Sequence, residues 1–194
     1  MKIKRIVCGL VMASAILMGG ATPSMAASPA AGGGGYPTPP PGAPTMTDAE
    51  MDAVSSDSVV LMTGDVGSNS RAVIAAAGDS CDLKTGRMWT RSSSKGEPYG
   101  GVGAKPELFN CTPGVVQTRI TSEVWMHNGW IWFRAAGPVS RPGQGNMVQK
   151  NLTYVCKGTG KYPFKVKATG WGKNSRGQEH AATVWSAEYK FSCG

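Results

Sequence analysis

The stretch "EVWMHNGWIWFR", residues 123–134, predicts a β-hairpin. Its Asn128-Gly129 pair separates two apolar runs, and both residues tolerate the positive φ angles that a two-residue hairpin turn requires. Such a turn sets His127 opposite Trp130 and Trp125 opposite Trp132, with the neighbouring positions following in the same register. We therefore expect these residues to form an antiparallel strand pair.

Side chains alternate between the two faces of a strand, so the hairpin residues separate into two sets. One set is apolar and is expected to face the core: Val124, Met126, Ile131 and Phe133. The other set combines indole rings with polar and charged groups: Glu123, Trp125, His127, Trp130, Trp132 and Arg134. On this second face we expect Trp125 to be buried, Trp130 and Trp132 to be exposed near the turn, and Glu123 to pair with Arg134.

Short strands separated by turn residues account for most of the chain, and together they predict an all-β, immunoglobulin-like antiparallel β-sandwich. The expected strands are 58–63, 71–77, 86–91, 114–126, 130–136, 147–156, 162–171 and 181–193. Thr47 and Glu50 have the spacing of a capping box, which predicts one short helix through Ser55.

The N-terminal residues predict export. Lys2, Lys4 and Arg5 precede an apolar run, and small residues ending at Ala26 resemble a signal peptidase site. We therefore expect a secretory signal at 1–26, a Gly/Pro-rich tether at 27–45 that contains "AGGGGYPTPPPGAP", and one domain at 46–194. This reading predicts a secreted, extracellular and monomeric protein without a membrane span.

Four cysteines follow the expected signal, which in an exported chain predicts two disulfides. The sequential pairing, Cys81–Cys111 and Cys156–Cys193, is favoured because each bridge then joins neighbouring strands. A competing pairing has its own argument, because Cys111, Trp125 and the Tyr-x-Cys that ends at Cys156 imitate an immunoglobulin pattern. The four cysteines are spread singly along the chain, without the close pairs typical of a zinc site, which argues against zinc binding.

Basic side chains are concentrated in the second part of the chain, where residues 84–194 hold sixteen bases and five acids. Such an excess attracts anionic partners, although it is equally compatible with scattered solvated charges. Flat indoles beside cations suit a planar anionic cofactor, so haem or another porphyrin is a candidate ligand. The candidate cofactor-binding residues are Arg87, Arg91, His127, Trp130, Trp132, Arg134, Lys165, Lys167, Lys173 and Arg176.

The four-cysteine order, together with "YGGVGAKPELFNC" at 99–111 and "TYVCKGTGKYPFKVKATGWG" at 153–172, resembles small secreted actinobacterial proteins with an immunoglobulin-like sandwich. Among these it is most similar to the secreted antioxidant proteins of skin cutibacteria. The resemblance covers most of the chain after residue 26, and it implies removal of radicals outside the cell. It carries over no catalytic residue.

Two functions remain open from the sequence. The first is a secreted antioxidant, since oxidisable Trp, Tyr and Met side chains are plentiful and no hydrolytic constellation is recognisable. The second is a binding module for glycans or anionic host polymers, which needs only an aromatic platform beside cations. Nucleic acid is not an expected partner.

Overall fold

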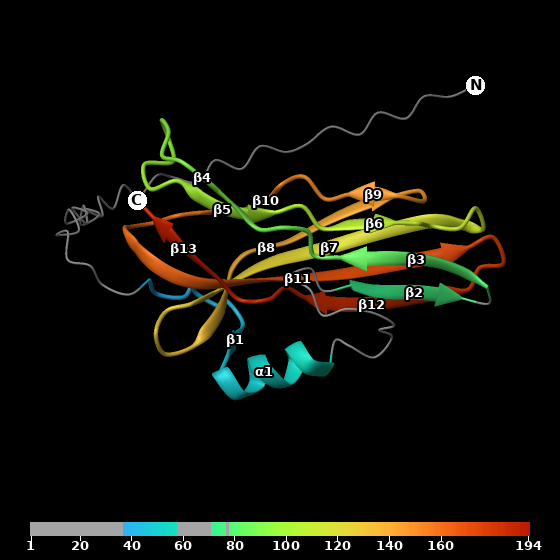
Figure 1. The fold of residues 1–194 in the computed structure, drawn as a ribbon, viewed down its shortest axis with the longest axis horizontal. Coiled ribbons are helices and arrows are strands. Elements are labelled where there is room, and N and C mark those ends of the chain that lie inside the picture. Colours follow the sequence, from blue (N-terminus) through green and yellow to red (C-terminus); the bar gives the residue numbers. More distant parts are fainter. Residues whose placement is uncertain (1–36, 58–70, 77) are drawn as a thin grey trace, which may run out of the picture. The chain divides into compact units, whose positions relative to one another are not determined.

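The computed structural model describes residues 37–57, 71–76 and 78–194, and there the chain forms antiparallel sheets with one short helix (Figure 1). The expected strand at 58–63 lies outside the described residues. Where the structure describes the chain, the all-β prediction with two disulfides is confirmed. The elements are β1 Thr45–Met46, α1 Asp48–Asp57, β2 Arg71–Ala76, β3 Asp79–Lys84, β4 Trp89–Arg91, β5 Gly101–Ala104, β6 Glu107–Phe109, β7 Val115–His127, β8 Trp132–Gly143, β9 Met147–Val148, β10 Leu152–Val155, β11 Gly160–Asn174, β12 Glu179–Trp185 and β13 Tyr189–Cys193.

The largest sheet has six strands in the order β1-β8-β7-β11-β12, with β13 also paired to β11. Its centre consists of the three long strands β7, β8 and β11, which alternate apolar and polar residues as a sheet with two different faces requires. The hairpin predicted at 123–134 is the β7–β8 connection.

Shorter strands cover the inner face of this sheet and make the fold sandwich-like (Figure 1). They form a three-stranded sheet, β10-β5-β4, and a four-stranded sheet, β2-β3-β6-β9. The main core lies between the layers, where Val102 and Leu152 meet Val124, Phe133 and Phe164 of the large sheet. None of these five side chains exposes more than 1% of its surface, so burial of apolar area here supplies the main driving force for folding.

The hairpin register differs from the prediction by two residues. His127 pairs with Trp132 rather than Trp130, and a four-residue loop, 128–131, joins the strands. The Asn128 side-chain oxygen accepts hydrogen bonds from the backbone N–H groups of Trp130 and Ile131, so Asn128 closes a longer loop instead of entering a two-residue turn. A shift of two residues leaves Val124, Met126 and Phe133 on the predicted core face, because the side-chain period of a strand is two. Ile131, which was also expected there, lies in the loop and is half-buried.

The capping box predicted at Thr47 is present and begins α1. The Thr47 backbone N–H donates to the Glu50 carboxylate at 2.7 Å, and the Glu50 N–H donates to the Thr47 hydroxyl at 3.2 Å. The Thr47 hydroxyl also donates to the Glu50 carboxylate, at 2.8 Å. The two hydrogen bonds that this carboxylate accepts from Thr47, the backbone one first and the hydroxyl one second, lower the pKa of Glu50. The reciprocal pair satisfies N–H groups that the first helical turn would otherwise leave unpaired.

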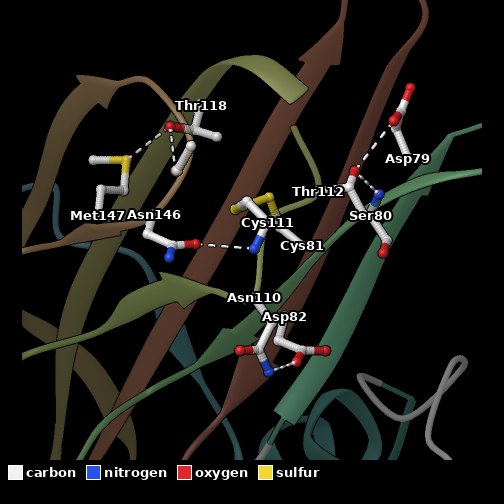
Figure 2. Close-up of a disulfide and its surroundings, with 11 residues drawn as sticks. Asp79, Ser80, Cys81, Asp82, Asn110, Cys111, Thr112, Thr118, Asn146 and Met147 are labelled. Carbon is white, nitrogen blue, oxygen red and sulfur yellow. Dashed lines mark hydrogen bonds between the residues drawn. A yellow bond between two sulfur atoms is a disulfide. The ribbon is translucent and has the colours of Figure 1, made fainter. Parts of the chain in front are cut away.

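Both disulfides follow the sequential pairing. Cys81–Cys111 links β3 to the segment after β6, and Cys156–Cys193 links the end of β10 to β13, which joins the two layers. Figure 2 shows the first bridge, where the Cys111 backbone N–H donates to the side-chain oxygen of Asn146 at 2.9 Å.

The proline-rich stretch expected to be a tether contacts the domain from residue 37 onward. The Asn128 side chain donates to the Pro37 carbonyl, the Arg134 N–H donates to the Pro44 carbonyl, and β1 pairs with β8. Residues 37–45 therefore form part of the same folded unit as the strands, which extends that unit upstream of the expected boundary at residue 46. Residues 27–36 lie outside the described part of the chain.

Candidate functional site: an indole cluster beneath the helix

Helix α1 packs on the outer face of the six-stranded sheet, the face turned away from β5 and β10 (Figure 1). Its Met51 is fully buried against three indole rings, Trp125 of β7, Trp132 of β8 and Trp185 of β12. We call these four residues the indole cluster. It forms a second core on the face of the sheet that the sequence predicted to be a partly exposed surface.

Strand register brings the three indoles together. Trp125 lies between Arg134 on β8 and Lys165 on β11, while Lys167 lies between Glu123 on β7 and Trp185 on β12. The Trp125 and Trp185 rings meet edge to face with centroids 5.5 Å apart, a favoured geometry for aromatic pairs.

Two predictions about this face need correction. Trp132 is 4% exposed instead of solvent-facing, because α1 and β1 cover the end of the hairpin. Alternation along the expected strand 181–193 predicts one inward row, Trp185, Ala187, Tyr189, Phe191 and Cys193, with Trp185 in the core. Trp185 is buried, but on the outer face. The inward row predicted from Trp185 to Cys193 is interrupted between β12 and β13, and only the Tyr189 to Cys193 part faces the main core. The predictions that Trp125 is buried and Trp130 is exposed are confirmed, at 2% and 77%.

Glu123 connects the indoles to the basic side chains. Its carboxylate accepts a 2.8 Å hydrogen bond from the Trp125 indole N–H. Arg134 approaches the same carboxylate at 3.4 Å, which confirms the predicted ion pair, and Lys167 approaches it at 3.9 Å. A carboxylate held by two cations keeps a fixed orientation toward the indole nitrogen.

The two lysines also lie over indole faces. The Lys165 ammonium is 5.4 Å from the Trp132 ring centre, and the Lys167 ammonium is 5.7 Å from that of Trp185. Such cation–π contacts stabilise the neutral ring and oppose any positive charge that develops on it. Among the described contacts, Trp125 differs from its two neighbours in having a carboxylate at its N–H.

His127 lies at the edge of the cluster and is held by neighbouring groups. Its Nδ1 accepts from the Gly129 N–H at 3.2 Å, so the Nε2 of a neutral ring carries the proton and faces the Asp48 carboxylate at 3.2 Å. The ring centre is 5.2 Å from that of Trp132.

The remaining candidate residues lie elsewhere. Lys173 pairs with Glu179 at the far end of β11, eight residues from Lys165, which corresponds to about 26 Å along a strand. Arg176 and Arg87 are exposed, and Arg91 pairs with Glu97 at 3.2 Å on β4. The ten predicted residues therefore divide into a central group under α1 and several separate positions.

The central group does not fit a porphyrin. Stacking needs an open ring face, whereas Trp132 is buried and has Lys165 on one side and His127 beside it. The Nε2 atom that would ligate iron faces Asp48. Trp130 has an exposed ring, but it lies at the hairpin tip, outside the central group. The central group therefore does not form a porphyrin site.

Sequence reasoning missed Met51 as a member of the cluster. The capping box could have identified Met51, because it predicts a helix that begins at Thr47. Such a helix places the apolar residues Met51 and Val54 on one face, three residues apart. Within residues 37–57, 71–76 and 78–194, no group of three or more His, Cys, Asp or Glu could hold a metal ion. In the same ranges, no helix is long and apolar enough to cross a membrane.

Comparison of the chain with protein-family models, curated proteins and solved structures finds no match in any of the three. Its function is therefore argued from its own residues.

Proposed function

We propose that the chain is a secreted antioxidant that removes radicals outside the cell, and that Trp125 of the indole cluster is its primary site of oxidation. The observation that carries the proposal is the 2.8 Å hydrogen bond from the Trp125 indole N–H to Glu123. The signal-like N-terminus and the two disulfides support an oxidising, extracellular location. The layered antiparallel sheets support the immunoglobulin-like type of sandwich expected from the resemblance.

The step is a one-electron oxidation coupled to a proton transfer. An organic radical takes one electron from Trp125 and is reduced by it, and the indole becomes a radical cation. Its N–H proton then passes to Glu123 along the existing hydrogen bond, leaving a neutral indolyl radical and a protonated carboxyl group. Because Lys165 and Lys167 oppose positive charge on Trp132 and Trp185, the electrostatics favour Trp125.

The test is the decay of a coloured organic radical cation mixed with purified protein. We expect Trp125→Phe and Glu123→Gln to slow the fast phase, and electron paramagnetic resonance of the parent protein to detect a neutral indolyl radical. Trp171→Phe is the matched control, because the Trp171 N–H also faces a carboxylate, that of Glu179 at 3.3 Å, outside the cluster. Equal slowing by Trp171→Phe, or equal quenching by native and denatured protein, would refute a specific site.

A second candidate function is a binding module for glycans or anionic host polymers. One observation favours it, the 77% exposure of Trp130 at the hairpin tip on a strongly basic part of the chain. Retention on a heparin column at low salt that Trp130→Ser abolishes would support this function. Failure to be retained at low salt would exclude it.

A further inference from the structure

A cavity of about 330 Å³ lies between the proline-rich segment and side chains from β8, β10, β11 and the loop after β10. One wall is the segment 37–41, which we call the proline arm, and the opposite wall comes from Phe133, Tyr154, Lys157 and Tyr162. The volume is at the lower end of the range found for small-molecule sites in proteins. The cavity is separate from the indole cluster, since it involves none of the cluster's four residues.

The proline arm is fixed on both sides of the cavity. Upstream, the Pro37 carbonyl accepts from the Asn128 side chain at 3.2 Å. Downstream, the Pro44 carbonyl accepts from the Arg134 N–H at 3.1 Å, and β1 then joins the sheet. Prolines restrict the backbone of the arm further, so this wall is preformed and a ligand would lose little free energy in ordering it.

Seven of the eleven residues that line the cavity carry an aromatic or proline ring. Phe133 and Tyr154 are 1% and 6% exposed and form the deep side, while Tyr162 is half-buried and its hydroxyl donates to the Thr159 carbonyl at 2.9 Å. That hydrogen bond holds the Tyr162 ring in place. Flat apolar walls of this kind suit a small planar ring.

Two polar groups give the cavity a preference for an anion. These groups are Tyr154 and Lys157, which both line the cavity, and a phenol hydroxyl can donate a hydrogen bond to a carboxylate. Burial raises the pKa of Tyr154, which keeps that hydroxyl protonated at neutral pH. The Lys157 side chain is exposed at the rim, and the described lining residues include this lysine and no acid.

We propose that this cavity binds a small aromatic carboxylate, with its ring between the proline arm and Tyr162 and its carboxylate directed toward the Tyr154 hydroxyl and the Lys157 ammonium. A neutral aromatic molecule would gain the ring contacts alone. This site is independent of the proposed antioxidant function and would remain if Trp125 proved to have no redox role.

The test uses 5-fluoroindole-3-acetate as the probe and fluorine NMR of the full chain as the readout. The matched neutral probe is 5-fluoro-3-methylindole, which keeps the ring and lacks the carboxylate. We expect the acid to bind about tenfold or more tightly than the neutral compound, as the loss of one charge-assisted contact predicts. No broadening of the acid's resonance at millimolar concentration, or equal affinity of the two probes, would overturn the proposal.

Two variants locate the site. Tyr154→Phe removes the donor and keeps the ring, and Lys157→Gln removes the charge at an exposed position where folding should be retained. Each should weaken binding of the acid about fivefold or more, whereas Lys161→Gln, at an exposed lysine outside the lining, should change it less than about twofold. An equal effect of Lys157→Gln and Lys161→Gln would show attraction to general positive charge and would refute the cavity as the site.

Discussion

Met51→Ala is the most direct test of the indole cluster, because Met51 joins α1 to the sheet. The Met51 side chain is fully buried against Trp125, Trp132 and Trp185. Burying a methionine contributes about 1.5–3 kcal/mol, and buried Met→Ala changes cost about 2–5 kcal/mol when the cavity is included. A surface helix can settle partly into the space that is left, so we expect the free energy of unfolding to fall by about 2–3 kcal/mol.

Urea unfolding followed by tryptophan fluorescence and by far-ultraviolet circular dichroism measures this loss. With a slope of about 1–3 kcal/mol per molar urea, the midpoint should fall by about 0.7–3 M. The parent fluorescence should show buried indoles, and the variant spectrum should shift to longer wavelength as water reaches them. Asp52→Ala is the control on the same helix, since Asp52 is exposed and its removal should change stability by less than about 0.5 kcal/mol.

The reasoning fails if Met51→Ala unfolds at the same urea concentration as Asp52→Ala. Helix α1 would then contribute no packing on this face, and the three indoles would be held by the strands alone.

Three further predictions concern the cap, the cavity and the second disulfide. Thr47→Ala should lower the free energy of unfolding by about 1 kcal/mol. Because the pKa of Glu50 is lowered in the folded state, the part of this difference that comes from the Thr47 hydroxyl donating to the Glu50 carboxylate should be lost as pH falls through that pKa, and the part from the Glu50 N–H should remain. Burial raises the pKa of Tyr154 above its ordinary value of 10.0, so the contribution of the protonated Tyr154 to stability is complete below pH 10.0 and is lost as pH rises through the folded pKa; phenolate absorbance against Tyr154→Phe measures this. Replacing Cys156 and Cys193 with serine opens a loop with a sequence separation of 37 and should cost about 3–4 kcal/mol, measured by urea unfolding of the two proteins.

Hairpin residues in the strands could be assigned to the correct faces from the sequence, because side chains alternate with a period of two residues. A register shift of two residues therefore leaves each strand residue on the same face. Val124 and Phe133 face the core, and Trp125 and Arg134 face outward, although the register differs by two residues from the expected one. The turn type could not be predicted from the Asn128-Gly129 pair, because Asn128 also bonds the Pro37 carbonyl, a contact between residues far apart in the sequence.

Glycine-rich strands were the hardest to recognise. The sequence around Gly101 and Gly103 resembles a loop, but it forms β5 in the covering layer. A Cβ added at Gly103 would lie 2.6 Å from the Trp89 ring, so only glycine fits at this position. The ring that excludes a larger residue is brought there by the tertiary fold, from a different strand. Local propensity carries no information on such a contact.

The outer face of the sheet is buried by helix α1. The sequence predicted this helix correctly but did not show where it packs. The capping box at Thr47 identified the helix, but the packing role of its apolar pair, Met51 and Val54, was not recognised from the sequence. Only the tertiary fold shows that the Met51 side of α1 packs on Trp132. This contact buries an indole face that was expected to be exposed.

Coverage by α1 also decides how an oxidant can react with the cluster. A radical that abstracts a hydrogen atom must touch its target, whereas an electron can pass from Trp125 through the thin layer formed by Met51 and the helix backbone. Because the Trp125 proton has an internal acceptor in Glu123, the oxidant does not need to reach the indole nitrogen. We therefore expect Met51→Ala, measured in low urea where it remains folded, to leave the fast phase of radical decay unchanged while Glu123→Gln slows it. A large acceleration in Met51→Ala would instead mean that contact with the indole limits the reaction, and would contradict electron transfer through the helix.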